Sequence, residues 1–162
     1  MEFEKYTERA KGFVQSAQGL ALRSGHQRLT PEHLLKVLLE DKGGLCANLI
    51  RAAGGDPQSV HSAVETELSK QPRVDGSGAG QVYLTPEIAG VFEQAEKIAE
   101  KAGDSFVTVE RLLLALAMAT ETRAGKALAA AGVNPQKLNA AIEDLRKGRK
   151  ADSPSAEEAT TR

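Results

Sequence analysis

The sequence is poor in the residues that build several common classes of protein. It has no tryptophan, two tyrosines and four phenylalanines, so aromatic residues make up only 4% of its 162 positions. Because β-sandwiches usually draw on aromatic and β-branched side chains, this scarcity favours close-packed helices with an aliphatic core. The single cysteine, Cys46, excludes an internal disulfide, fits a reducing compartment and is expected to be a small core residue.

Other features are missing as well. No apolar stretch approaches the roughly 20 residues of a membrane span, and the start, Met1–Glu4, has neither a basic region nor an apolar run. Lys and Arg number 21 against 22 Asp and Glu, which gives a net charge of −1. Nothing in this balance favours nucleic acid or an anionic membrane as a partner. We therefore expect a cytoplasmic protein.

The strongest positive signal is a stretch that occurs twice. Gly25–Leu38 returns 78 positions later as Gly103–Leu116, and each copy predicts the end of one helix and the start of the next. Glycine ends a helix in the left-handed conformation without steric cost, a threonine caps the next helix, and a glutamate in its first turn suits the helix dipole. Leucines at helical spacing then form one buried face.

The same offset relates the rest of the chain. Identical pairs include Gly12/Gly90, Ala17/Ala95, Thr30/Thr108, Glu32/Glu110, Leu34/Leu112, Leu35/Leu113, Ala52-Ala53-Gly54/Ala130-Ala131-Gly132 and Pro57/Pro135. Two copies are too few for a solenoid. The sequence therefore predicts an all-α fold of eight helices, in which two tandem four-helix repeats pack about a pseudo-two-fold axis and their junction leaves a groove.

The domain organisation follows from this pattern. We expect one domain over residues 1–150, with repeat one at about 7–71, a loop at 72–84 and repeat two at about 85–148. The glycines between 76 and 80 indicate a linker. A phosphate-binding loop would need a preceding strand and a Lys-Ser/Thr pair, both of which are missing. Residues 151–162 lack an apolar face, and they are expected to form a flexible tail or a linker towards an absent domain.

No pattern in the chain indicates catalysis. His26, His33 and His61 form no metal-ligand motif, and we expect exposed histidines with structural roles. No Gly-x-Ser-x-Gly nucleophile motif occurs. A helix-turn-helix DNA-binding domain is disfavoured because the second helix of each repeat is mostly leucine and therefore buried. The sequence predicts a binding module without metal or cofactor, not an enzyme.

The repeated motif resembles a known family. Helix–Gly–Thr-x-Glu-x-Leu-Leu units, each closed by Ala-Ala-Gly-x-(Asp/Asn)-Pro, resemble the duplicated N-terminal domain of Clp-type AAA+ chaperones over about residues 3–150. Residues 3–7, 103–107 and 139–148 resemble the disaggregase branch more than the protease-coupled unfoldases. Residues 152–159 resemble the start of the linker to the first ATPase domain.

The resemblance implies a function outside the chemistry of this chain. A disaggregase of this kind is an ATP-driven, magnesium-dependent hexamer that works with the DnaK chaperone system and threads polypeptides out of aggregates. Its N-terminal domain engages exposed apolar segments of unfolded or aggregated clients. The chain has no Walker motif, so we expect it neither to bind nor to hydrolyse ATP. We also expect this chain by itself to be a monomer, in contrast to the hexameric parent. The alternative is an adaptor-docking domain of a protease-coupled Clp unfoldase.

The resemblance also implies functional residues, which match Thr7, Asp104 and Glu110. A capping role explains Thr7 and Glu110 equally well, and Glu110 has a counterpart in Glu32 of repeat one. Asp104 corresponds instead to a histidine, so the fold does not require an aspartate there. For an apolar groove contact we select Phe92, the largest apolar side chain of its helix, with Val91 and Phe106 as alternatives.

Overall fold

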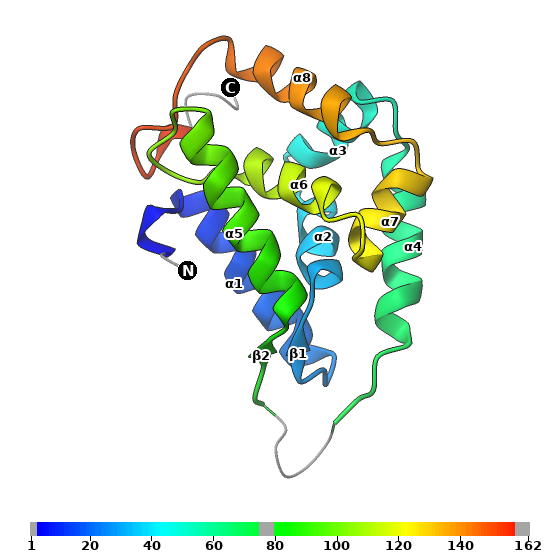
Figure 1. Ribbon diagram of the computed structural model, residues 1–162. Coiled ribbons are helices and arrows are strands. Elements are labelled where there is room, and N and C mark those ends of the chain that lie inside the picture. The colour runs from blue at the N-terminus through cyan, green and yellow to red at the C-terminus, as the bar shows by residue number, and fades with distance from the viewer. Residues whose placement is uncertain (1–2, 75–79, 158–162) are drawn as a thin grey trace.

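The computed structural model describes residues 3–74 and 80–157, and this part of the chain folds into eight α-helices (Figure 1). This confirms the predicted all-α class. A 3-10 turn, η1, covers Phe3–Lys5, and two short strands, β1 and β2, cover Arg28–Leu29 and Tyr83–Leu84. The helices are α1 Glu8–Arg23, α2 Pro31–Leu39, α3 Leu45–Ala52, α4 Pro57–Ser69, α5 Pro86–Lys101, α6 Val109–Met118, α7 Arg123–Ala130 and α8 Pro135–Arg146.

Local sequence explains where most helices begin and end. Gly25 and Gly103 adopt φ angles of 72° and 80° just after α1 and α5, a backbone conformation that glycine takes without steric cost. Four helices carry proline near their first position, where the missing N–H leaves no bond unmade. Side chains that cap helix N-termini by accepting a backbone hydrogen bond are those of Thr7, Thr30, Asp56, Thr85, Thr122 and Asn134.

The two repeats pack about a pseudo-two-fold axis. The apolar helices α2 and α6 occupy the centre. α4 packs on α2 of its own repeat and on α7 across the axis, while α3 packs mainly on α8 of the other repeat. The equivalent Ala-Ala-Gly turns meet at the axis. There the backbone N–H of Asp56 donates to the carbonyl of Ala131 at 3.3 Å, and a Cβ on Gly132 would lie 3.2 Å from the carbonyl oxygen of Gly54. The close approach of the two backbones favours glycine at position 132, and both Gly54 and Gly132 have positive φ angles, 89° and 95°, which glycine adopts without steric cost.

The core is aliphatic and continuous through both repeats. Cys46 is 1% exposed, as predicted for a small core residue. The large side chains with less than 2% exposure come from both repeats and include Leu34, Leu35, Leu38, Ile50, Ile88, Leu112, Leu113, Leu116 and Leu128. Equivalent leucines of α2 and α6 are therefore buried alike, and the leucine face of the duplicated stretch is part of the scaffold.

Residues 72–84, expected to be a loop, contain the strand β2. It pairs in parallel with β1, with Arg28 opposite Tyr83 and Leu29 opposite Leu84. The hydroxyl of Thr85 then donates to the carbonyl of Leu29 at 2.9 Å. Periodicity could not reveal two-residue strands, because their pairing depends on segments more than 50 positions apart. Residues 75–79, which hold most of the glycine-rich stretch, lie outside the described residues.

Residues 147–157, which we call the C-terminal segment, pack against the domain. This corrects the expectation of a flexible tail for residues 151–157. Ala151 and Glu157 are 1% and 2% exposed. The carbonyl of Ala151 accepts hydrogen bonds from the backbone N–H groups of Ser105 and Phe106, at 2.8 and 3.0 Å. Backbone groups and one carboxylate hold the segment in place. The sequence shows no sign of this packing, because it does not depend on an apolar face. Residues 158–162 lie outside the described part.

Candidate functional site

Asp104 lies directly after the glycine that ends α5, and its carboxylate is buried. Oδ1 accepts from Nη1 of Arg146 at 3.0 Å and from the backbone N–H of Ala151 at 2.9 Å. Oδ2 accepts from Nη2 of Arg146 at 2.8 Å and from Nε of Arg111 at 3.2 Å. Burial by itself would raise the pKa of Asp104, but the bonds from Arg146 and Ala151 outweigh it and hold the pKa below its usual value. Asp104 is therefore an ionised residue at the centre of a hydrogen-bonded group.

Glu110 joins the same group through Arg146. Nε of Arg146 donates to Oε1 of Glu110 at 2.6 Å, and its Nη2 donates to the hydroxyl of Thr108 at 3.0 Å. Both side chains are at most 3% exposed. Burial would lower the pKa of Arg146, but Asp104 and Glu110 raise it, so the guanidinium stays charged. We call Asp104, Glu110, Arg111 and Arg146 the Asp104 cluster; its two carboxylates and two guanidinium groups balance in charge.

Thr7 lies beside this cluster and connects to it through the C-terminal segment. Its hydroxyl accepts from the backbone N–H of Ala10 at 3.1 Å and donates to a carboxylate oxygen of Glu157. The other oxygen of Glu157 accepts the backbone N–H of Val109 at 2.7 Å, at the start of α6. The side chain of Thr108, the N-cap residue of α6, makes no capping hydrogen bond, and Glu157 caps the helix instead. Burial raises the pKa of Glu157 to about 7 against the opposing bonds from Thr7 and Val109.

The three residues implied by the resemblance are thus brought to one region, but their side chains do not face solvent. Thr7, Asp104 and Glu110 are 0%, 8% and 1% exposed. A polypeptide client cannot contact them directly in this conformation. Their position instead allows them to fix the start of α6 and the path of the C-terminal segment.

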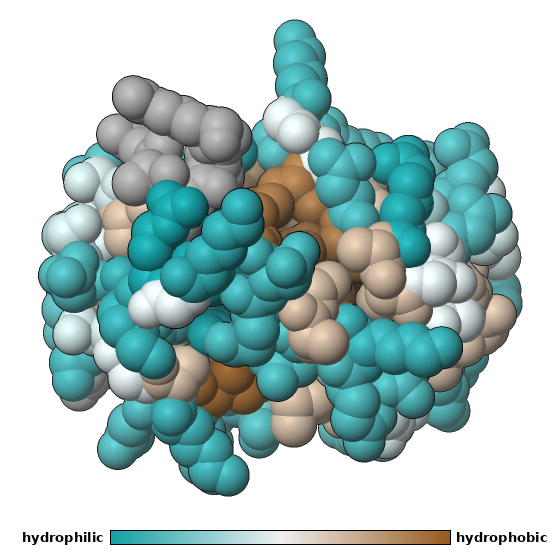
Figure 2. All heavy atoms as spheres, turned by 90° about the horizontal axis from the view of Figure 1, so that it is seen from above, coloured by the Kyte–Doolittle hydropathy of each residue, from teal (hydrophilic) through white to brown (hydrophobic). Residues whose placement is uncertain are grey.

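A groove with an apolar lining lies next to the Asp104 cluster, between α5, α6 and α8. Its volume is about 420 Å³. Viewed from above in Figure 2, hydrophobic atoms are visible between hydrophilic side chains at this end of the molecule. Arg111 and Glu143 form part of one wall and are joined by a hydrogen bond of 3.3 Å. The remaining lining residues are Ile98, Lys101, Ala102, Leu114, Met118, Pro135, Gln136 and Asn139.

Sequence reasoning missed the apolar residues of this groove, although the repeat carries the signal for them. Leu114 and Met118 occupy the positions that Lys36 and Glu40 hold in repeat one. Met118 is 43% exposed, and few large apolar side chains among the described residues are as accessible. Leu114 is 4% exposed and lies at the base of the groove. Repeat one has a smaller pocket of about 250 Å³ at the equivalent place, and Lys36 lines it where repeat two has Leu114.

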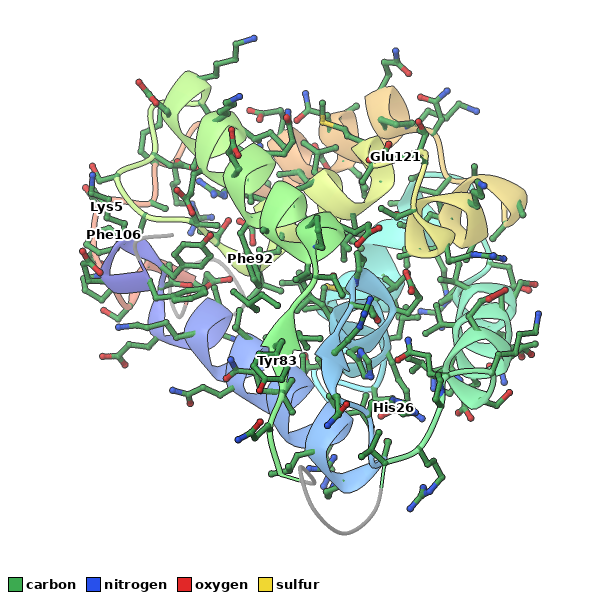
Figure 3. All side chains as sticks on the ribbon, turned by 60° about the horizontal axis from the view of Figure 1, so that its bottom comes forward. Lys5, His26, Tyr83, Phe92, Phe106 and Glu121 are labelled. Carbon is green, nitrogen blue, oxygen red and sulfur yellow. The ribbon has the colours of Figure 1, made fainter. Side chains whose placement is uncertain are left out.

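Phe92 does not line this groove. It points from α5 towards α1 in Figure 3 and is 0% exposed. Its ring centroid lies 5.4 Å from that of Phe3 and 6.2 Å from that of Tyr6, both edge-on. The expectation that Phe92 is an accessible groove contact is therefore corrected, because the N-terminal turn covers it. Val91 is 1% exposed, and Phe106 packs near the N-terminal turn instead of in the groove.

Repeat one places a histidine pair where repeat two has Asp104 and Arg111. Nδ1 of His26 lies 2.9 Å from Nε2 of His33. The backbone N–H of Thr30 donates to Nδ1 of His33 at 3.0 Å, so the proton of His33 lies on Nε2 and is donated to His26. Burial, with the nearby His26 and Lys36, lowers the pKa of His33 to about 4. His26 and His33 are 7% and 0% exposed, which corrects the expectation of exposed histidines for these two residues.

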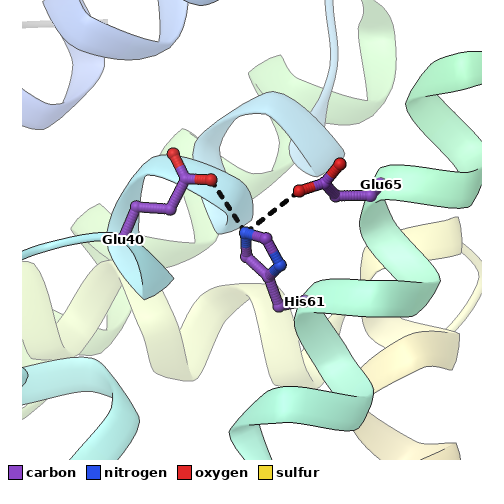
Figure 4. Close-up of side chains that lie close together, drawn as sticks. All are labelled: Glu40, His61 and Glu65. Carbon is purple, nitrogen blue, oxygen red and sulfur yellow. Dashed lines mark hydrogen bonds and ion pairs between the residues drawn. The ribbon is translucent and has the colours of Figure 1, made fainter.

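One other group of side chains has donor atoms suited to a metal ion. Ligand atoms of Glu40, His61 and Glu65 lie within 4.8 Å of one another, and Nε2 of His61 is 2.8 Å from Oε2 of Glu40 (Figure 4). Nζ of Lys36 is 3.7 Å from the carboxylate of Glu40 and 3.5 Å from that of Glu65. Because this ammonium already pairs with both carboxylates, a cation would have to displace it, and an ion-pair network explains the group.

The chain is similar to known chaperone domains. Residues 5–131 match the family described as the Clp repeat (R) N-terminal domain. The ClpB chaperone of Rhodopseudomonas palustris is 60% identical over 159 residues, and that of Mesorhizobium japonicum is 56% identical over 158 residues. Each alignment covers 98% of this chain but only 18% of the relative. The chain thus spans about a fifth of the length of these curated relatives.

Solved structures show the same fold. The N-terminal domain of Hsp104 from Candida albicans superposes with a TM-score of 0.78 and covers 94% of this chain and 98% of its own. Its sequence identity is 22%, so the similarity concerns the fold alone. No helix among those described here is long and apolar enough to cross a membrane.

Proposed function

The chain belongs to the Clp repeat (R) N-terminal domain family, in its ClpB type, and on this premise we propose that it binds exposed apolar segments of unfolded or aggregated polypeptides. The binding site is the groove between α5, α6 and α8. One observation carries this proposal: Met118 presents apolar surface beside the buried Leu114 in repeat two, where repeat one has the ion-paired Glu40 and Lys36. An apolar lining with charged groups at its wall suits an extended segment with a few apolar side chains.

The dimensions of the groove favour weak and sequence-tolerant binding. A volume of about 420 Å³ accommodates only a few side chains. Each leucine-sized side chain that is buried contributes about 1.5–3 kcal/mol, from which the cost of ordering a disordered client must be subtracted. Flexible Met118 can adapt to different side chains. We therefore expect dissociation constants of about micromolar or weaker, which suits a domain that must release its clients.

The wider role is proposed for a longer chain of the ClpB type. There the domain would pass captured segments to the channel of an ATP-driven, magnesium-dependent hexamer that cooperates with DnaK in the cytoplasm. The similarity to ClpB chaperones over 98% of this chain supports the proposal. ATP and magnesium would be bound by parts of such a protein outside these 162 residues.

Replacing Met118 with glutamate, the residue that repeat one carries there, tests the groove. Binding of permanently unfolded casein is measured by fluorescence anisotropy. We expect Met118→Glu to weaken binding about tenfold or more, because a charge enters the apolar lining. Leu22→Glu is the matched control, since Leu22 is 48% exposed on α1, outside the groove, and Met118 is 43% exposed.

Three results would contradict the proposal. One is casein affinity that is unchanged in Met118→Glu, and another is an equal loss in the control. The third is absence of casein binding together with a saturable one-to-one complex with a folded adaptor, which would favour the adaptor-docking alternative.

A further inference from the structure

The C-terminal segment is docked on the same residue that supports the wall of the groove. The backbone N–H of Ala151 donates to Oδ1 of Asp104, and the carbonyl of Pro154 accepts the backbone N–H of Glu8 at 2.8 Å. The carboxylate of Glu157 is bonded to Thr7 and to the backbone N–H of Val109. In Figure 1 this segment runs beside the N-terminus and the end of α5. Its contacts therefore join α1, α6 and the loop after α5.

The two carboxylate oxygens of Asp104 bind different neighbours. Oδ1 binds the C-terminal segment, whereas Oδ2 binds Nε of Arg111 at 3.2 Å. The guanidinium of Arg111 continues to Oε1 of Glu143 at 3.3 Å, and both of these side chains line the groove. Arg146 bonds to both oxygens of Asp104 and so fixes the plane of the carboxylate. A continuous set of short contacts thus connects Ala151 to the groove wall.

We infer that docking of the C-terminal segment and occupation of the groove are thermodynamically linked through Asp104, which acts as a positioning residue for Arg111. The inference rests on the proposed client binding. With the segment docked, Asp104 holds Arg111 against Glu143, and the wall is ordered before a client arrives. When the segment leaves, Oδ1 loses its backbone donor and the wall loses part of its support. A client then has to order the wall itself and binds more weakly.

The linkage is reciprocal. If docking strengthens client binding by a given factor, a bound client strengthens docking by the same factor. Typical couplings between sites lie between about fivefold and 150-fold, and we expect the lower end, about fivefold, because one carboxylate carries the connection. In a chain that continues beyond this segment, as the longer relatives do, client capture would then fix the direction in which the chain leaves the domain.

The experiment uses the whole 162-residue chain with casein as the client. A maleimide fluorophore on Ser155→Cys reports docking, and the only native cysteine, Cys46, is buried and stays unlabelled. Glu157→Ala releases the segment without touching the groove, and Thr7→Val provides a second route because it removes a partner of Glu157. Asp152→Ala, an exposed position of the same segment, is the matched control. Circular dichroism verifies that each variant is folded.

We expect Glu157→Ala and Thr7→Val to increase fluorophore mobility and to weaken casein binding about fivefold, while Asp152→Ala changes neither. In an Arg111→Gln background, Glu157→Ala should change casein affinity by less than about twofold, because the connection to the wall is absent. Saturating casein should reduce fluorophore mobility in the wild-type background.

Two outcomes would overturn the linkage while leaving the proposed function intact. One is a released segment with unchanged casein affinity, and the other is an equal loss of affinity in both backgrounds. Absence of casein binding to the wild-type chain would overturn the proposed function, and the linkage with it.

Discussion

Arg146→Leu is the substitution from which the structure predicts the largest loss of stability. Arg146 donates five hydrogen bonds within 2.6–3.2 Å, to Asp104, Glu110, Thr108 and the carbonyl of Arg149. Its equivalent in repeat one is Leu68, so leucine fits this position of the helix. After the change Asp104 keeps Arg111, but Glu110 loses its ion pair while it remains 1% exposed.

The magnitude follows from the carboxylate left behind. Breaking a buried pair by removing one partner costs about 3–5 kcal/mol, because the other charge stays buried without compensation. A domain of this size loses about 2–4 °C of melting temperature per kcal/mol, so we expect a decrease of about 6–20 °C. Thermal and urea unfolding followed by circular dichroism measure both quantities. Since total stability is about 5–15 kcal/mol, the variant should still fold at 25 °C unless the domain lies at the low end.

Two further variants test the reasoning. Glu110→Gln combined with Arg146→Leu should recover most of the loss. Arg123→Leu, which removes a pair exposed at the surface, should cost at most about 1 kcal/mol. A loss below about 1 kcal/mol for Arg146→Leu at pH 7 would refute the account.

Three further predictions follow from burial. Because the unfolded chain protonates His33 near pH 6.5 and the folded chain only near pH 4, stability should fall by about 2 kcal/mol between pH 7 and 5, and urea unfolding of His33→Gln should lack this component. Glu157 has a raised pKa of about 7, so docking should be strongest below about pH 4.5 and weaken as pH rises through 7; an unchanged Ser155→Cys fluorophore signal across this range would contradict it. Gly125→Ala should destabilise the domain by about 1–3 kcal/mol, since its Cβ would lie 2.0 Å from the carbonyl oxygen of Ala119. Gly12→Ala should stabilise it by about 0.5–1 kcal/mol, because the added Cβ would meet no atom within 4 Å. Similar melting temperatures for the two variants would contradict this prediction.

Much of the fold could be predicted because it is encoded locally and twice. Helix ends at Gly25 and Gly103 and starts at Thr30 and Thr85 follow from the chemistry of one or two residues each. Burial of the leucine faces follows from helical spacing. The duplication then constrained how the helices assemble, since any contact made by one repeat had to be possible for the other.

The candidate site was only partly predictable, because its essential contacts join distant residues. Proximity of Asp104, Glu110 and Arg146 requires α8 to fold back on α6, which no spacing reveals. Phe92 has the character of a groove residue in sequence, and only the N-terminal turn that covers it makes it part of the core. Docking of the segment around Ala151 depends on backbone groups, which every residue carries.

The meeting of the two Ala-Ala-Gly turns has a consequence for the origin and engineering of the fold. Because α3 packs mainly on α8 and one side of α4 packs on α7, a single repeat made alone would leave these surfaces of α3 and α4 uncovered. Two copies of one repeat could supply the missing surface to each other through an isologous interface, in which the Gly54 turn meets its own copy. Repeat one, expressed by itself, is therefore a template for a symmetric homodimer. Joining two such subunits in one chain frees each to diverge, one keeping charges at its surface while the other acquires a groove.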